Sequence, residues 1–173
     1  MKRIVLPLLL LFFLLFHGYP QSILAYVAGG AGSATLAPAS SAWQTGETSD
    51  VAIQIKSGTA AISSVAVRVN IPVISSDIEV TGIDTNTALS EWSFPVKTAS
   101  VVGNSIQVDI MALNTSVSGA TIATPTTLAT IHIRALKAFS AKTITFDTSV
   151  SKMYKKSPAE DILGTLSGGS YNA

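Results

Sequence analysis

The stretch Ile62–Pro72 limits most strongly what this chain can fold into. Apolar β-branched residues occupy positions 65, 67, 69 and 71 and alternate with Ala66, Arg68, Asn70 and Pro72. Residues two apart point to the same side of a β-strand, so the pattern predicts a strand with one buried and one solvated face. Its β-branched side chains suit a pleated, half-buried surface. The rest of the chain is therefore expected to be sheet built around this strand.

The first 30 residues are typical of a secretory signal peptide. Lys2 and Arg3 precede an apolar run from Ile4 to Phe16, and small residues follow further on. The run is short for a membrane span, which needs about 20 apolar residues, so a cleaved signal is favoured over an uncleaved anchor reaching Val27. The sequence predicts a chain that is secreted or lies at the cell surface, with a signal at 1–30 and one domain at 31–173.

The charge balance and the absence of cysteine narrow the classes of function and fold. Removal of the signal leaves nine Lys and Arg against ten Asp and Glu, without a basic cluster. Nucleic acid and anionic lipid are therefore not expected as main partners, and no membrane contact is expected after the signal is removed. Because the chain has no cysteine, the exported domain must be stabilised by its core instead of by disulfides.

Alternating apolar residues recur along the rest of the chain and predict further short strands. They occur in Ala34–Ala37, Val51–Ile55, Ile78–Ile83, Trp92–Val96, Ile106–Ala112, Leu128–Leu136, Lys142–Asp147 and Gly169–Asn172. Gly82 interrupts its segment as a bulge would, Val101–Asn104 is predicted as a turn, and Lys152–Asp161 as a charged loop. About nine strands without a helical period predict an all-β, nine-stranded β-sandwich with jelly-roll or Greek-key connections.

Four stretches resemble the cohesin domain and its relatives in the carbohydrate-binding-module-like superfamily. They are Thr45-Gly46-Glu47 before an alternating strand; Ile62–Pro72 followed by Ile78-Glu79-Val80; the late strand Leu128–Ala135; and the closing Asp161–Gly164 with Gly168–Tyr171. The resemblance spans about residues 34–173. It implies a cohesin-like β-sandwich without catalytic activity.

The resemblance also implies a partner and a binding face. Cohesins of the complexes that degrade polysaccharides bind calcium-loaded dockerin modules of other secreted proteins, on a sheet face formed by the third, fifth, sixth and eighth strands. Placed on this chain by strand order, the exposed positions of that face are Arg68, Asn70, Ser93, Gln107, Asp109, Met111, Thr143 and Thr145. A secreted, dockerin-like protein is therefore the expected partner.

Two other functions are consistent with the residues. The superfamily and the aromatic residues allow a carbohydrate-binding module, in which Trp43 and Tyr154, both in predicted loops, would contact a polysaccharide. Trp92 is in phase with Phe94 and Val96, so it is predicted to pack in the core. A surface rich in Ser, Thr, Ala and Gly with little charge also allows a self-assembling structural protein of the cell surface.

The sequence offers little for catalysis, metal binding or a cofactor. His132 is the one histidine after the signal, and its mid-strand position favours a solvent-facing or hydrogen-bonded side chain over a catalytic one. The adjacent Glu160 and Asp161 do not make a glycosidase pair. Asp84-Thr85-Asn86 with Asp77 would supply too few ligands for calcium, so an Asx-turn is the preferred interpretation. No enzyme, cofactor or metal is predicted.

Overall fold

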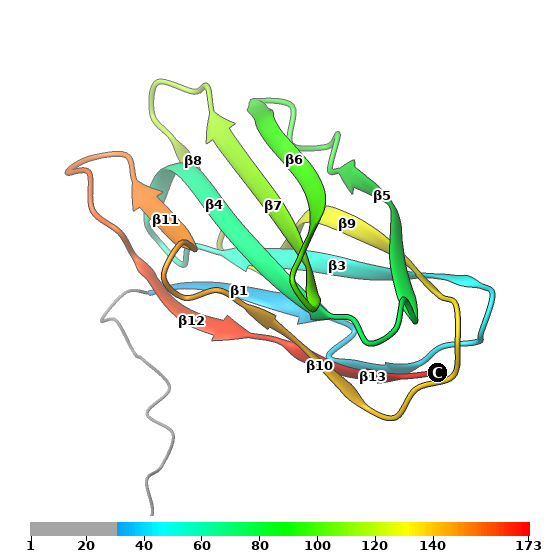
Figure 1. Cartoon of the computed structure of the whole chain (residues 1–173). Coiled ribbons are helices and arrows are strands. Elements are labelled where there is room, and N and C mark those ends of the chain that lie inside the picture. Colours follow the sequence, from blue (N-terminus) through cyan, green and yellow to red (C-terminus); the bar gives the residue numbers. More distant parts are fainter. Residues whose placement is uncertain (1–30) are drawn as a thin grey trace, which may run out of the picture.

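The computed structural model describes residues 31–173 as two packed β-sheets (Figure 1). The five-stranded sheet contains, in spatial order, β12 (Leu163–Ser167), β1 (Gly32–Ala37), β3 (Thr48–Lys56), β9 (Thr126–Ala135) and β5 (Ile78–Thr85). The eight-stranded sheet has the order β2 (Ser40–Ala42), β13 (Gly169–Asn172), β10 (Lys142–Phe146), β4 (Ala61–Pro72), β7 (Ser105–Asn114) and β6 (Trp92–Val102), with β8 (Ala120–Thr121) and β11 (Lys152–Lys155) also paired to β4. The predicted all-β sandwich is confirmed. The predicted signal at 1–30 lies outside the described residues.

The strand β4 occupies the centre of the eight-stranded sheet, as its pattern predicted. It pairs antiparallel with β7 from Ser64 to Pro72 on one side, and β8 continues that side. On the other side it pairs with β10 near Asn70 and with β11 near Val65. Neighbours on both sides pair its backbone groups, and its alternating side chains divide between the core and the solvent side of the sheet.

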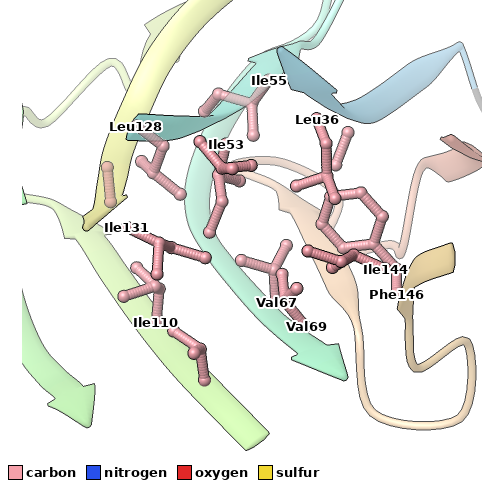
Figure 2. Packing of buried hydrophobic residues seen from close by; sticks show 14 of the residues in the cluster. Leu36, Ile53, Ile55, Val67, Val69, Ile110, Leu128, Ile131, Ile144 and Phe146 are labelled. Atoms are coloured by element: carbon pink, nitrogen blue, oxygen red, sulfur yellow. The ribbon is translucent and has the colours of Figure 1, made fainter. Parts of the chain in front are cut away.

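The core lies between the inner faces of the two sheets. The alternating residues of β4, Val65, Val67, Val69 and Ile71, are all 3% exposed or less. They pack with the buried residues of the facing strands, and Figure 2 shows Ile53 and Ile131 across from Val67 and Val69. Each fully buried aliphatic side chain contributes about 1.5–3 kcal/mol relative to exposure, so this cluster is what holds the two sheets together.

The first and last segments cross between the sheets side by side. The strand β1 pairs parallel with β12 in the five-stranded sheet, and β2 pairs parallel with β13 in the eight-stranded sheet. Gly168 lies where the last segment crosses, and a Cβ at this position would overlap the carbonyl oxygen of Ile144. The chain can turn from β12 into β13 here because glycine has no side chain.

Two predicted loops are strands in the structure. The charged segment Lys152–Asp161 contains β11, because its backbone pairs with β4 and the Asp161 carboxylate accepts hydrogen bonds from the backbone N–H groups of Met153 and Leu163. Val101 and Val102 end β6, and only Gly103 and Asn104 form the turn, with Gly103 at a φ of 59°. Charge and hydropathy do not report such pairing. The sequence predicted about nine strands, and residues 31–173 contain thirteen, the additional ones being the short strands β2, β8, β11 and β12.

The bulge predicted at Gly82 is confirmed. The register between β5 and β9 shifts between Val80 and Gly82, where two residues of β5 pass one position of the partner strand. No helix within residues 31–173 has the length and hydropathy that a membrane span requires.

Candidate functional site

All eight residues predicted for partner binding lie on the solvent side of the eight-stranded sheet, which we call the outer face. Arg68 lies opposite Asp109 on the neighbouring strand, and Asn70 lies opposite Gln107 on one side and Thr145 on the other. Residues directly opposite in a sheet point to the same side, so the strands β10, β4 and β7 bring these five side chains together.

The remaining three predicted residues extend the outer face in both directions. Met111 is two positions from Asp109 on β7, and Thr143 is two positions from Thr145 on β10. Ser93 on β6 lies opposite Leu113, which follows Met111 on the same side. Period-two alternation therefore places Met111, Thr143 and Ser93 on the outer face as well.

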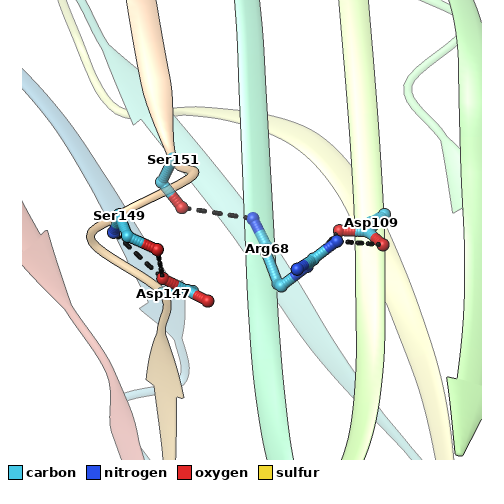
Figure 3. Close-up of polar contacts among 5 residues, drawn as sticks. All are labelled: Arg68, Asp109, Asp147, Ser149 and Ser151. Carbon is cyan, nitrogen blue, oxygen red and sulfur yellow. Dashed lines mark hydrogen bonds and ion pairs between the residues drawn. The ribbon is translucent and has the colours of Figure 1, made fainter. Parts of the chain in front are cut away.

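Arg68 and Asp109 form a two-pronged ion pair across β4 and β7 (Figure 3). The Arg68 Nε lies 2.7 Å from Asp109 Oδ1, and Nη2 lies 3.1 Å from Oδ2. This fork geometry fixes both side chains more firmly than a single contact would. The hydrogen bond and the charge of Asp109 raise the pKa of Arg68, so the guanidinium stays protonated.

The loop between β10 and β11 runs alongside β4, on the side away from β7 and close to this ion pair. Asp147 Oδ1 accepts hydrogen bonds from the Ser149 hydroxyl at 2.6 Å and from its backbone N–H at 2.9 Å, and these bonds lower the pKa of Asp147. The backbone N–H of Arg68 donates to the Ser151 hydroxyl at 3.2 Å (Figure 3). These hydrogen bonds attach the loop to β4 at the border of the outer face.

A shallow pocket of about 280 Å³ opens on the outer face beside the ion pair. Ala66, Val96, Met111 and Val150 supply its apolar lining, and Arg68 and Asp109 supply its charged border. Val150 comes from the fixed loop and is 41% exposed. The outer face is therefore not uniformly polar, because it contains one apolar site next to an ordered pair of opposite charges.

Sequence reasoning missed the pocket because it placed Val96 in the core. A register shift between Ser93 and Val96 turns Val96 to the outer face, opposite Met111. Trp92 and Phe94 come before the backbone has shifted, and both pack against the core as predicted. Pro95 was the available signal, because proline within a strand favours an edge or a bulge.

Asn70 has one unpaired polar atom at the centre of the outer face. Its Oδ1 is buried and accepts no hydrogen bond from residues 31–173. A buried acceptor without a donor costs roughly 1–3 kcal/mol.

The solved structures to which this chain is similar include several cohesins. CaCohA2 from Clostridium acetobutylicum superposes with a TM-score of 0.61 over 82% of this chain and 90% of its own, at 13% identity. The OlpC cohesin, from a type I cohesin–dockerin complex of Clostridium thermocellum, superposes with a TM-score of 0.60. The match covers 82% of this chain and 92% of the OlpC chain, at 15% sequence identity. This chain has the cohesin fold. A non-cellulosomal cohesin from the archaeon Archaeoglobus fulgidus superposes with a TM-score of 0.53. The match covers 82% of this chain and 89% of the archaeal chain, at 15% sequence identity.

The likeness to cohesins is one of fold. No family model matches the sequence, and no curated protein does. The identities of 13–15% to these cohesins accompany a shared arrangement of the chain in space and not a shared sequence.

The other exposed sheet face of this cohesin-like domain carries a histidine between two carboxylates. His132 Nδ1 lies 2.7 Å from Asp50 Oδ1 on β3, and Nε2 lies 3.1 Å from Asp84 Oδ2 on β5. The hydrogen bonds with Asp50 and then Asp84 raise the pKa of His132 above its ordinary value. The preferred interpretation of a hydrogen-bonded histidine is confirmed, and the ring links three adjacent strands.

This arrangement predicts a stability that decreases with increasing pH. Because the folded pKa of His132 is raised, its contribution is fully present below about pH 6.5 and is lost as the pH rises through the raised value. Urea titrations should show wild type more stable than His132→Gln at about pH 6, with the difference shrinking at about pH 9. An equal difference at both pH values would contradict this role. Substitution of both Asp50 and Asp84 by Asn should remove the pH dependence in the same way.

The structure corrects the expectation that Trp43 contacts a glycan. Trp43 is 7% exposed and stacks on Tyr171 with ring centroids 4.8 Å apart. The Phe139 ring meets it edge-on at 6.1 Å. Trp43 precedes a turn, which predicted a loop position, but its ring packs inward and has no free face for a sugar. Tyr154 is 41% exposed and lies opposite Ser64 on the outer face, so its glycan contact stays a prediction.

The carboxylates considered for calcium have separate structural partners. Asn86 Oδ1 accepts from the Ala88 N–H at 3.0 Å, which confirms the Asx-turn. Asp77 and Asp84 lie at opposite ends of β5, so they do not converge. No cluster of three or more His, Asp or Glu side chains within residues 31–173 is arranged to hold a metal ion.

Asp77 forms a buried ion pair with Lys142 at one end of the sandwich. The Lys142 Nζ lies 2.8 Å from Asp77 Oδ2 and donates to the Pro72 carbonyl at 3.1 Å. Both side chains are less than one-tenth exposed. Asp77 Oδ1 accepts from the Ile74 N–H at 3.0 Å. Burial by itself raises the pKa of Asp77, but the bonds from Lys142 and Ile74 outweigh it and leave the pKa lowered.

Proposed function

We propose that residues 31–173 form a non-catalytic interaction module that holds a dockerin-type protein on the outer face. The cohesin fold supports this proposal, because several solved cohesins of this fold are complexes with dockerins. The pocket beside the Arg68–Asp109 ion pair carries the proposal most directly. The proposal also includes export of the chain, for which the signal-like residues 1–30 are the support.

The chemistry of the outer face suits a folded protein partner. A side chain of the partner can enter the pocket formed by Ala66, Val96, Met111 and Val150, and hot spots of binding energy concentrate in such desolvated pockets. The Arg68–Asp109 pair is already ordered, so little side-chain entropy is lost when a partner covers it. The hydroxyl and amide groups around the pocket supply hydrogen bonds at the rim.

Capture of secreted proteins tests the proposed partner. Residues 31–173 would be immobilised, exposed with calcium to the secreted fraction of the source organism, and eluted with a chelator. Mass spectrometry should identify a chelator-released protein that carries paired calcium-loop repeats. Retention of no such protein would contradict a dockerin-type partner.

A matched pair of substitutions tests the outer face. Ala66→Trp fills the pocket and should weaken binding of the captured protein by about 30-fold, the size of a hot-spot loss. Ala52→Trp makes the same change on β3, at a central, partly exposed position of the other sheet, and should leave binding unchanged. Titration calorimetry measures both.

Replacement of the polar residues tests the same face independently. Simultaneous substitution of Arg68, Asn70, Gln107 and Asp109 by Ala removes both members of the ion pair, so no lone charge remains. Unchanged capture by this variant, or equal losses from Ala66→Trp and Ala52→Trp, would show that the partner binds elsewhere.

A further inference from the structure

The strand β6 leaves one edge of the eight-stranded sheet unpaired. Within residues 31–173, its one hydrogen-bonded neighbour is β7, and it stands last in the sheet (Figure 1). Every residue from Lys97 to Val102 is exposed, and Val101 and Val102 are 74% and 51% exposed. An unpaired edge of this kind presents a row of free N–H and C=O groups to any strand that can lie alongside it.

Only the first half of this edge is protected against pairing. Pro95 has no N–H to donate, the bulge before Val96 distorts the strand, and Lys97 carries a charge. From Thr98 to Val102 the edge has no charge, proline or bulge, and it ends at the Gly103 turn. Pro95 and the bulge on one side and the Gly103 turn on the other leave Val96–Val102 for pairing, with Lys97 as its one charged residue and Ala99 as its centre.

We propose that a second copy of this chain pairs antiparallel with β6 about a two-fold axis at Ala99. In this register Ala99 lies opposite Ala99, Lys97 lies opposite Val101, and Val96 lies opposite Val102 of the second copy. The two Lys97 side chains are four residues apart along the strands, roughly 14 Å, so their repulsion is largely screened. Pro95 lies opposite Gly103, where pairing stops in both copies.

The edge is self-complementary, which favours a second copy over another extended chain. Val96 contacts Val102 of the second copy, and Val101 contacts the methylene stem of its Lys97. Both copies contribute the same seven residues, so no part of the stretch is left without a partner. Such a contact buries less than the roughly 1,200 Å² of a stable interface, so the dimer is transient. Opposite residues point to one side, so the two outer faces would lie side by side in one continuous sheet.

Cysteine substitutions test the register because the chain has no cysteine of its own. Ala99→Cys places two thiols directly opposite each other, with Cα atoms about 4.5–5.5 Å apart, which is within disulfide range. Val101→Cys places them about 14 Å apart, beyond that range. Mild oxidation of residues 31–173 at high concentration should cross-link Ala99→Cys and leave Val101→Cys monomeric. Cross-linking of Val101→Cys instead, or of neither variant, would overturn the proposal.

Sedimentation equilibrium tests the association without a cross-link. Wild type should show concentration-dependent dimers, and Ala99→Lys should abolish them because two like charges would then face each other at the axis. Thr148→Lys adds the same charge in an exposed turn and should dimerise like wild type. A strictly monomeric wild type, or an Ala99→Lys variant that dimerises equally, would overturn the proposal. If β6 pairs instead with an extended peptide of another protein, residues 31–173 would stay monomeric by themselves and bind that peptide, which would also overturn the proposal.

Discussion

Replacement of Lys142 by Met is expected to lower the free energy of unfolding by about 3–5 kcal/mol. The ammonium group of Lys142 is the charged partner of Asp77, and both side chains are almost fully buried. Without Lys142, the Asp77 carboxylate stays buried with backbone N–H groups, that of Ile74 among them, as its donors and no positive charge beside it. It must then either remain charged without compensation or take up a proton, and both cost free energy.

A double variant separates this charge effect from lost packing. Lys142→Met with Asp77→Asn leaves no buried charge, and the Asn oxygen can still accept from the Ile74 N–H, so most of the stability should return. Urea unfolding of the wild type, both single variants and the double variant gives the coupling directly. A double variant as unstable as Lys142→Met would mean that the methylene stem, and not the charge, stabilises this end of the sandwich.

The same pair should make the domain sensitive to acid. Because the folded pKa of Asp77 is lowered, its contribution is present above about pH 4 and is lost as the pH falls through the folded value. His132 acts in the opposite direction, since its contribution is lost as the pH rises. Stability should therefore be highest between the two transitions.

Replacement of Trp43 by Ala is expected to lower the free energy of unfolding by about 3–5 kcal/mol, the range for a buried aromatic. Trp43 packs between Tyr171 and Phe139, so the substitution leaves a cavity beside the last strand. Tyr171, whose hydroxyl donates to the Pro38 carbonyl at 2.6 Å, would lose its stacking partner. Burial also raises the pKa of Tyr171 to about 12, so its hydroxyl stays protonated and can donate.

Tyr154→Ala is the matched control for the Trp43 substitution. It also removes an aromatic ring, but Tyr154 is 41% exposed. The free energy of unfolding should therefore change by no more than about 0.5 kcal/mol. Denaturant titration followed by circular dichroism measures both variants. Equal stabilities of Trp43→Ala and wild type would contradict the structural role of Trp43.

The sandwich could be predicted because several of its strands alternate with a period of two without interruption. The alternation in β4, β7 and β10 depends only on which residues are apolar, and it placed Arg68, Asp109 and Thr145 on one side before any pairing was known. Strand order, taken from the cohesin resemblance, then brought these side chains onto one face. The prediction of the outer face therefore depended on the alternation within each strand and on one assumption about the order of the strands.

What the sequence did not reveal depends on bulges and on distant partners. Val96 reaches the outer face because the backbone of β6 shifts by a position, and the hydropathy of its neighbours carries no trace of that shift. Trp43 packs on Tyr171, which is 128 positions further along the chain, so no local pattern indicates its burial. Lys142 and Asp77 find each other across two sheets in the same way.

The parallel pairing of the terminal strands has a mechanical consequence. Tension applied to the chain through the start of β1 and the end of β13 pulls β1 and β12 in opposite directions along their common axis, and does the same to β2 and β13. The hydrogen bonds of both parallel pairs then carry the load together in shear, whereas a hairpin pulled at its open end would lose them one after another. This geometry makes the sandwich resistant to unfolding when the chain is pulled from the start of β1 and the end of β13.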